Sequence, residues 1–363
     1  MARALKKRLN ICFMAWLLAA LTAGCGGGGG GGDSSASKET NQPADTTKPW
    51  VVFTVPWHNA QGVAINSKIA ATFSEDMDSA TITAGTFTVE VSGSAVQGTV
   101  TYDATSRTAI LTHGELTANT VYTATIATGI KDLAGNAVAV AYTWSFTTGV
   151  MRDDTPPTVL STIPAHNALN VALNTAIALT FSEAMNPFTV TAQTFTLWQN
   201  GAIPVAGSVV YIGPTAFFKP AGNLSANSAY TAEIAGEAGG APWVEDLAGN
   251  PMISNYVFEF TTGSALDITP PQIVSTNPPD GAINVPVDTS IDATFDEPML
   301  PFAGGLIDGR PVIVTFDPAY TTASMQSTVG LKPSSHYTAT ANFQDLAGNR
   351  MAARYTWGFT TAP

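Results

Sequence analysis

The chain has 363 residues, a formal net charge of −12 and a low sequence pI of about 4.6. Without the four basic residues among the first eight positions, 11 lysines and arginines face 27 aspartates and glutamates. This balance argues against nucleic acid or anionic lipid headgroups as partners, because both need clustered basic side chains. An acidic surface of this kind is compatible with divalent cations.

The first segment of the chain is typical of a secretory signal. Its basic start is followed by an unbroken apolar run at residues 11–21, which is shorter than the roughly 20 residues needed to cross a bilayer. The segment ends in Leu-Thr-Ala-Gly-Cys at residues 21–25 and resembles the lipobox of bacterial lipoproteins, in which the cysteine is acylated and becomes the new N-terminus. The resemblance implies a signal peptide at residues 1–24 and a lipid anchor at Cys25. The alternative is an ordinary signal with an incidental cysteine.

Residues 25–46 are rich in glycine and polar side chains and cannot bury apolar surface, so we expect a flexible tether. The other cysteine, Cys12, lies in the expected signal peptide. The exported chain would therefore hold one acylated cysteine and no disulfide.

The lipobox resemblance, with Gly26 after the cysteine, implies a lipid-anchored protein of the cell envelope, at the outer membrane or cell surface in a Gram-negative cell.

Three motifs recur in constant order along the rest of the chain. Phe-(Ser/Asp)-Glu-x-Met begins at residues 73, 181 and 295, Asp-Leu-Ala-Gly-Asn at 132, 246 and 345, and Phe-Thr-Thr at 146, 260 and 359. The intervals are about one domain long, so the motifs define three copies of one unit. With boundaries at the Pro-containing linkers, repeat 1 spans residues 47–149, repeat 2 spans 154–264 and repeat 3 spans 267–361.

Within each repeat the pattern predicts strands. Residues 69–73 and 176–181 are short runs with apolar side chains on alternate positions, and Tyr142, Trp144 and Phe146 share one face of a later strand. Such alternation predicts one face in the core and one in water. The predicted fold class is all-β: three tandem immunoglobulin-like β-sandwich domains after the signal peptide and tether.

A tyrosine in each repeat lies six residues after a leucine and opens an alternating strand: Tyr122, Tyr230 and Tyr337. The spacing is typical of the tyrosine corner, in which the hydroxyl bonds back to the backbone near the leucine. We expect the removal of this hydroxyl to leave a buried backbone acceptor unpaired.

Taken together, these residues resemble the bacterial Ig-like domain first noted in S-layer proteins. The resemblance covers residues 47–361 three times over, and it implies a sandwich used as a spacer or display module in surface proteins, often without activity of its own. Repeat 3 departs from the pattern, because Tyr337 lies 38 positions after Met299, whereas the corresponding spacing is 45 positions in the other repeats. Repeat 2 carries an insertion at residues 237–245.

The strand directions predict that two acidic loops of each repeat meet at the pole next to the linker. Linker acids such as Asp153, Asp154 or Asp267 would join them there, and Ca²⁺ binds 6–8 oxygens including carboxylates. The alternative is turn chemistry, in which the aspartate bonds the backbone ahead of it while Gly and Asn accept positive φ. The loop carboxylates that form the candidate calcium site are Glu75, Asp132, Glu183, Asp246, Glu297 and Asp345.

Binding and catalysis are the two other functions that the residues bear on. Trp50, Trp57, Trp198 and Trp243 fall outside the shared core pattern, and Trp198 and Trp243 are candidates for stacking on a polysaccharide or contacting another surface protein. We find no nucleophile elbow, metalloprotease motif or phosphate-binding loop, and three repeats with a tether use up the length, so we predict no enzyme.

The sequence thus predicts a non-catalytic surface lipoprotein that acts as a structural spacer or display rod, with calcium as the one candidate cofactor. The alternative is an adhesion or binding module for a glycan or a protein, and no nucleic acid is expected as a partner.

Overall fold

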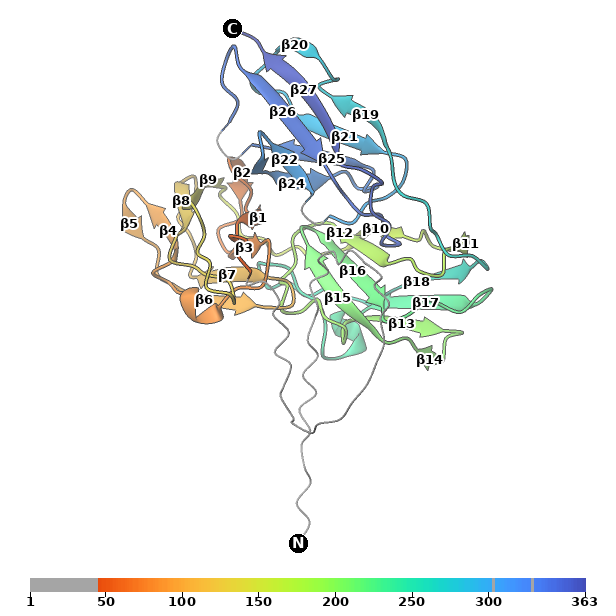
Figure 1. The fold of residues 1–363 in the computed structure, drawn as a ribbon. Helices are drawn as coiled ribbons and strands as arrows, with labels where there is room; N and C mark the ends of the chain where they lie inside the picture. The colour runs from red at the N-terminus through yellow and green to blue at the C-terminus, as the bar shows by residue number, and fades with distance from the viewer. Residues whose placement is uncertain (1–44, 302–303, 328–329) are drawn as a thin grey trace, which may run out of the picture. The chain divides into compact units, whose positions relative to one another are not determined.

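A computed structural model describes residues 45–301, 304–327 and 330–363. Cys25, the predicted signal peptide and all but the last two residues of the predicted tether lie outside the described residues. Residues 45–363 form one compact unit. Each repeat within it folds into two facing β-sheets with its own hydrophobic core (Figure 1).

Repeat 1 contains nine strands and a single-turn 3₁₀ helix. In chain order they are β1 (Val51–Val55), β2 (Ala60–Val63), β3 (Ile69–Phe73), η1 (Ser79–Thr81), β4 (Phe87–Val91), β5 (Ser94–Ala95), β6 (Gly98–Asp103), β7 (Thr108–His113), β8 (Val121–Ile126) and β9 (Tyr142–Thr148). One sheet has the order β1-β3-β7-β6 and the other β2-β9-β8-β4-β5. All pairings are antiparallel except that of β2 with β9, which is parallel.

Repeats 2 and 3 have the same sheet orders. The elements of repeat 2 are β10 (Val159–Ile163), β11 (Ala168–Val171), β12 (Ile177–Phe181), β13 (Phe195–Gln199), β14 (Ile203–Pro204), β15 (Gly207–Ile212), β16 (Thr215–Pro220), β17 (Ala229–Ile234), η2 (Glu237–Gly239) and β18 (Tyr256–Thr262). Those of repeat 3 are β19 (Ile273–Asn277), β20 (Ala282–Val285), β21 (Ile291–Phe295), β22 (Gly305–Ile307), β23 (Arg310–Pro311), β24 (Ile313–Phe316), β25 (Thr322–Gln326), β26 (His336–Ala341) and β27 (Tyr355–Thr361).

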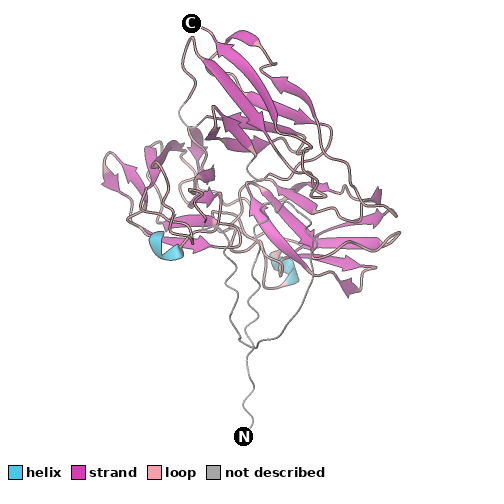
Figure 2. Ribbon diagram, viewed as in Figure 1, coloured by secondary structure: helices cyan, strands magenta, loops and turns pink. Residues whose placement is uncertain are grey.

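The predicted all-β class and the two departures between repeats are confirmed. Strands joined by loops make up the described residues apart from η1 and η2 (Figure 2). The shortening in repeat 3 falls on the strands after Met299: β22 has three residues where β4 and β13 have five, and β24 has four where β6 and β15 have six. The insertion in repeat 2 carries η2.

The tyrosine corner is present in all three repeats, but the predicted role of its hydroxyl was wrong. The Tyr122 oxygen accepts a hydrogen bond from the backbone N–H of Thr117 (2.8 Å), and Tyr230 and Tyr337 do the same for Ser225 and Lys332 (2.7 Å each). The hydroxyl therefore satisfies a backbone donor rather than an acceptor.

The last threonine of each Phe-Thr-Thr motif completes this corner. The Thr148 hydroxyl donates to the carbonyl of Thr117 (2.6 Å), and the hydroxyls of Thr262 and Thr361 donate to Ser225 (2.7 Å) and Lys332 (2.6 Å). The same backbone residue is therefore bonded through its N–H and its C=O, which fixes the loop before β8, β17 and β26.

One predicted pattern does not hold in repeats 1 and 2. The sequence predicted that the strands now seen as β3 and β12 would bury only alternate residues, yet all five residues of each are buried. In repeat 3 the corresponding strand β21 does alternate. The physical reason is that the outer side of the first sheet is covered in repeats 1 and 2, as described below.

Candidate metal centre

The structure brings the six predicted carboxylates together in pairs, one pair in each repeat, and adds an aspartate to each pair. Oxygen atoms of the three carboxylates in each group lie within 4.8 Å of one another. The groups are Asp45 with Glu75 and Asp132, Asp153 with Glu183 and Asp246, and Asp267 with Glu297 and Asp345. Repetition of one arrangement three times, in loops far apart in the sequence, makes these clusters the candidate site.

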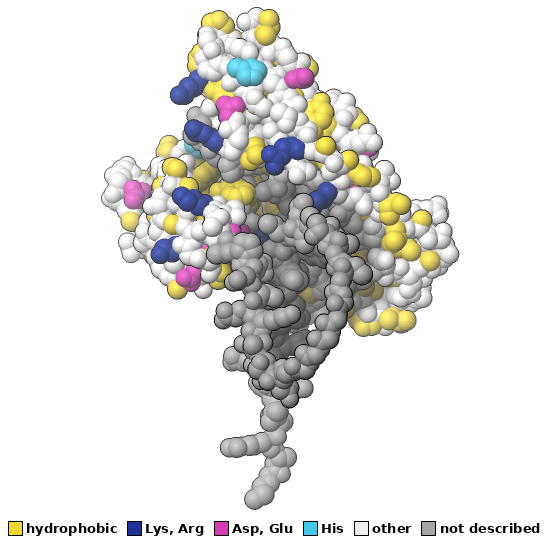
Figure 3. Space-filling view, in the orientation of Figure 1, with side chains coloured by type: hydrophobic (Ala, Val, Ile, Leu, Met, Phe, Trp, Pro, Cys, Tyr) yellow, Lys and Arg dark blue, Asp and Glu magenta, His cyan; other side chains and the backbone are white. Residues whose placement is uncertain are grey.

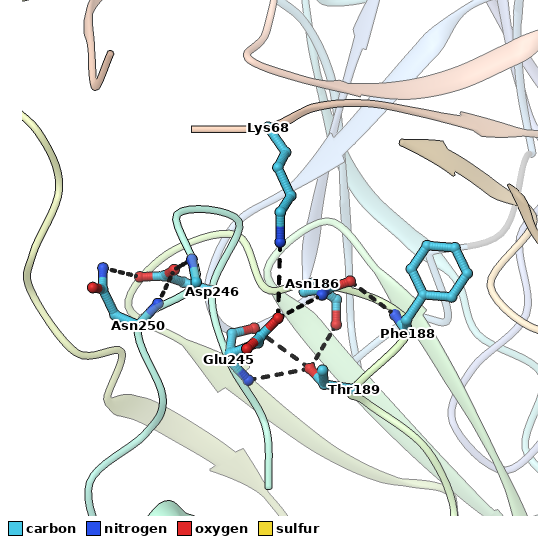
Figure 4. Close-up of polar contacts among 8 residues, drawn as sticks. Lys68, Asn186, Phe188, Thr189, Glu245, Asp246 and Asn250 are labelled. Atoms are coloured by element: carbon cyan, nitrogen blue, oxygen red, sulfur yellow. Dashed lines mark hydrogen bonds and ion pairs between the residues drawn. The ribbon is translucent and has the colours of Figure 1, made fainter. Parts of the chain in front are cut away.

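The aspartate of each Asp-Leu-Ala-Gly-Asn turn is held by the turn itself. In repeat 2, Oδ1 of Asp246 accepts the N–H groups of Gly249 (2.7 Å) and Asn250 (2.9 Å), and Oδ2 accepts the Asn250 side-chain amide (2.8 Å) (Figure 4). Asp132 and Asp345 make the corresponding bonds to Asn136 and Asn349. The predicted turn chemistry is therefore present for these aspartates, and the asparagine contributes its amide.

The same asparagine holds the third member of each cluster. The Asn250 amide also donates to the backbone carbonyl of Asp153 (3.1 Å), and Asn136 and Asn349 donate likewise to Asp45 (3.1 Å) and Asp267 (3.2 Å). A single side chain thus positions two acidic residues that are 78 to 93 positions apart in the sequence.

The glutamate comes from the loop after the second strand of the first sheet. A backbone bridge between Met185 and Asp246 joins this loop to the turn, and equivalent bridges link Met77 to Asp132 and Met299 to Asp345. Turn chemistry does not account for the glutamates. In repeat 1, the buried Oε1 of Glu75 has no hydrogen-bond partner.

The electrostatics of the clusters follow from burial and from like charges. Burial, together with the neighbouring Asp153 and Asp246, raises the pKa of Glu183 to about 8. Burial is also the main reason that the pKa of Glu75 and that of Glu297 rise to about 7, with neighbouring aspartates adding to it.

Among the turn aspartates, burial raises the pKa of Asp246 and of Asp345, although the hydrogen bonds from the turn act against it. In each cluster, therefore, burial and mutual repulsion destabilise the state in which all three carboxylates are charged. Binding of a proton or a cation offsets this destabilisation.

The donor set fits a calcium ion. Ca²⁺ is bound by carboxylates and carbonyls at about 2.3–2.6 Å, so two of its ligand oxygens lie at most about 5 Å apart. Oxygens within 4.8 Å of one another meet that limit, and three carboxylates supply three to six of the oxygens needed. Oδ2 of Asp246 accepts one hydrogen bond and keeps a lone pair free for a cation, whereas Oδ1 already accepts two.

The sequence reasoning missed Asp45 and included Asp154. Asp45 falls in the predicted tether, whereas the structure places it in the first cluster. The signal was present as an Asp-x-Thr pattern at residues 45, 153 and 267, in which the aspartate Oδ1 accepts the threonine N–H at 2.8–3.0 Å. Asp154 is exposed and lies 3.6 Å from Arg152 instead.

Comparison with known proteins gives these repeats a family. The family model described as "Bacterial Ig-like domain" matches residues 45–148, 153–262 and 267–361. The chain belongs to this family. Each matched Ig-like range begins at the aspartate of one cluster, so every cluster lies within one bacterial Ig-like domain.

Among individual proteins, the chain is 25% identical over 293 residues to an S-layer protein of Geobacillus stearothermophilus. The match covers 68% of this chain and 23% of the relative, so the chain spans about a quarter of the length of the curated protein that it matches.

Among solved structures, domains 1–6 of the surface layer protein SbsC share 11% identity with a TM-score of 0.25, over 87% of this chain and 54% of that one. The N-terminal part of SbsC shares 16% identity with a TM-score of 0.24, over 56% and 44%.

The two tryptophans predicted as a binding surface lie apart in repeat 2. Trp198 is half-buried on β13 with its Nε1 donating to Thr196 (3.1 Å), and Trp243 is half-buried in the inserted loop. Within the described residues, the rings of Trp198 and Trp243 do not contact each other. Within the described residues, the exposed tryptophan is Trp57 of repeat 1, which is 68% exposed, precedes β2 and also falls outside the shared core pattern.

On the face drawn in Figure 3, lysine and arginine side chains are separated from one another by neutral surface. Within residues 45–301, 304–327 and 330–363, no helix is both long and apolar enough to span a membrane.

Proposed function

We propose that the protein is a non-catalytic structural protein of the cell surface, in which three Ig-like domains act as a spacer stiffened by calcium. Its family and its similarity to an S-layer protein support the surface role. The observation that carries the calcium is the threefold recurrence of a carboxylate cluster with raised glutamate pKa values at the start of each domain.

Calcium at these positions would act on the elements that each cluster connects. The linker aspartate, the loop after the second strand and the Asp-Leu-Ala-Gly-Asn turn each supply one carboxylate. One bound cation would therefore tie the entry of the chain into a domain to two of its loops. Stiffness at that entry is what a spacer between a membrane and its surroundings needs.

Thermal unfolding of residues 45–363 in millimolar Ca²⁺ and in chelator tests this proposal. A ligand bound only by the folded state at a hundredfold excess over its Kd stabilises by about 2.7 kcal/mol, so we expect the melting temperature to rise by several degrees. Calorimetric titration should give about three sites per chain, one for each cluster.

A matched pair of variants makes the test specific. Changing Glu75, Glu183 and Glu297 to Gln removes one carboxylate from each cluster and leaves the turn aspartates intact. The control variant changes the exposed Glu90, Glu237 and Glu259 to Gln and has the same charge. The calcium response should vanish in the first and persist in the second. Identical melting curves for the unmodified protein with and without calcium would overturn the calcium proposal and leave turn chemistry as the role of the three turn aspartates.

We also propose that the chain is attached to the membrane through a lipid on Cys25, a residue that lies outside the described structure. Metabolic labelling with a radioactive or alkyne-tagged fatty acid should mark the protein in cells, and Cys25→Ser should abolish the label and release the protein into the soluble fraction. Labelling that persists in the variant would contradict this anchor.

Adhesion to a polysaccharide or another surface protein stays a second proposal, and a glycan array is its direct test.

A further inference from the structure

Two leucines pack against the domain that precedes their own in the chain, one from repeat 2 against repeat 1 and one from repeat 3 against repeat 2. Leu247 is 4% exposed and clusters with Ala70 and Ile110 of repeat 1. Leu346 is 7% exposed and clusters with Ala178 and Phe217 of repeat 2. Both are the second residue of an Asp-Leu-Ala-Gly-Asn turn.

The third copy of this turn provides an internal comparison. Leu133 of repeat 1 has the same neighbours in sequence, yet it is 73% exposed. The turn itself therefore does not bury the leucine, and burial of Leu247 and Leu346 comes from the preceding repeat.

The acceptor face is built from equivalent positions in repeats 1 and 2. It combines a residue at the end of the first strand with two paired residues of the next strands: Val55, Ala70 and Ile110 in repeat 1, and Ile163, Ala178 and Phe217 in repeat 2. This face is the outer side of β3 and β12, which explains why those strands are buried on both sides.

Backbone bonds fix the docked turn. The N–H of Lys68 donates to the carbonyl of Leu247 (3.2 Å), and the N–H of Ala176 donates to that of Leu346 (2.8 Å). Lys68 also reaches Glu245, next to the turn, with 3.8 Å between Nζ and Oε1 (Figure 4).

An asparagine of the acceptor repeat holds the linker in place. The side chain of Asn66 accepts the N–H of Asp153 (2.8 Å) and donates to its carbonyl (2.9 Å). Asn174 makes the same two bonds with Asp267 (2.9 and 2.8 Å). Both linkers are therefore fastened at the residue that begins the next domain.

Repeat 3 carries polar residues at all of these positions. Asn277, Asp292 and Ser324 replace the three apolar residues of the acceptor face, and Asp288 stands where Asn66 and Asn174 stand. The Asn277 amide donates to the carbonyl of Ser290 (2.9 Å), and the Ser290 hydroxyl donates to Asp292. A leucine docked here would lie against a carboxylate, and the carboxylate of Asp288 lacks the N–H donor of the asparagine.

We propose that the Asp-Leu-Ala-Gly-Asn turn is the docking element that fixes repeat 2 and repeat 3 on the acceptor face of the repeat before each of them. The polar face of repeat 3 closes this series, so that the exposed Leu133 turn of a second copy of the chain cannot dock there. Head-to-tail contacts that do not close on themselves generate filaments, and the four polar positions of repeat 3 prevent them. This inference stands apart from the proposed calcium.

The first experiment measures the opening of the junction between repeats 1 and 2. Trypsin cleavage after Arg152, in this linker, is followed in residues 45–363 under conditions that give one cut per molecule. Leu247→Ala should raise the rate at least tenfold, because the cut requires an undocked linker. Leu247 is not part of the core of repeat 2, so that domain stays folded.

The matched controls use the same turn. Leu133→Ala removes the same side chain from an exposed position and should leave the rate at Arg152 unchanged. Leu346→Ala opens the other junction and should also leave it unchanged. Equal rates in the Leu247 and Leu133 variants would overturn the docking role of the leucine.

The second experiment builds an acceptor face on repeat 3. A variant with Asn277→Ile, Asp288→Asn, Asp292→Ala and Ser324→Phe is compared with the unmodified protein by sedimentation velocity. We expect at least tenfold tighter self-association, and its loss when Leu133→Asp is added. Because the Phe substitution is bulky, the pair Asp288→Asn with Asp292→Ala is measured alongside it. A grafted protein that folds and stays monomeric at every concentration, or an unmodified one that already associates through Leu133, would overturn the closed face.

Discussion

At the scale of single residues, polar side chains decide where the loops of these domains lie. The Tyr230 hydroxyl accepts the N–H of Ser225 and the Thr262 hydroxyl donates to its carbonyl, so both backbone groups of one loop residue are satisfied by side chains. Tyr230 is buried, whereas the bond from Lys332 to Tyr337 in repeat 3 is exposed. Water can replace the second bond more easily than the first.

Tyr230→Phe should therefore lower the free energy of unfolding by about 1–3 kcal/mol, because it leaves the N–H of Ser225 without a partner in a partly buried loop. Tyr337→Phe should cost less, since solvent reaches its donor. Chemical denaturation of the two variants measures the difference. Equal losses would mean that packing of the ring, and not the hydrogen bond, sets the contribution of the corner.

At the scale of elements, the Asp-Leu-Ala-Gly-Asn turn has several roles at once. Its aspartate accepts the turn's own N–H groups, its asparagine holds the linker aspartate, and in two repeats its leucine docks on the domain before. The glycine allows the turn to form, because Gly135, Gly249 and Gly348 have φ of +91°, +96° and +94°. Other residues rarely adopt such values.

Gly135→Ala should destabilise repeat 1 by about 1–3 kcal/mol through backbone strain. The added methyl group meets no atom within 4 Å, so the cost is conformational rather than steric. Gly114→Ala is the matched control in the same repeat, because that glycine has equally open surroundings and no positive φ. It should be neutral or stabilise by up to about 1 kcal/mol. Calorimetry resolves the two, and a neutral Gly135→Ala would contradict the strain.

At the scale of the whole molecule, the carboxylate clusters link stability to pH. Burial and like charges raise the pKa of Glu75 and Glu297 to about 7 and that of Glu183 to about 8, from an ordinary value of 4.5. A carboxyl whose pKa is higher in the folded state stabilises it at low pH, and this contribution is lost as the pH rises through the folded pKa.

In chelator, the melting temperature should therefore fall as the pH rises from 5 to 8. Calcium should remove this fall, since a cation stabilises the charged carboxylates. The variant with Gln at positions 75, 183 and 297 should lack the fall in chelator, while the variant with Gln at 90, 237 and 259 should keep it. A fall of the same size in both variants would place the titrating groups elsewhere in the chain.

Much of this architecture is determined by the sequence alone. Three motifs in constant order define three copies of one domain, and the alternation of Tyr142, Trp144 and Phe146 predicts a strand with one buried face, as β9 has. Strand direction is sufficient to predict that Glu183 and Asp246 meet, because successive antiparallel strands return their loops to the same pole. These features are local or periodic, and period and spacing are visible in one dimension.

Tertiary structure decided the features that depend on what lies against a surface. Burial of both sides of β3 and β12 comes from leucines of the following domains, which no pattern within those strands encodes. The same motif leaves Leu133 exposed and buries Leu247, because burial is a property of two packed surfaces and not of one segment. By sequence alone Asp45 is part of a polar tether. In the structure its carbonyl accepts a hydrogen bond from the side-chain amide of Asn136, 91 residues later, and this long-range contact places Asp45 in the first cluster.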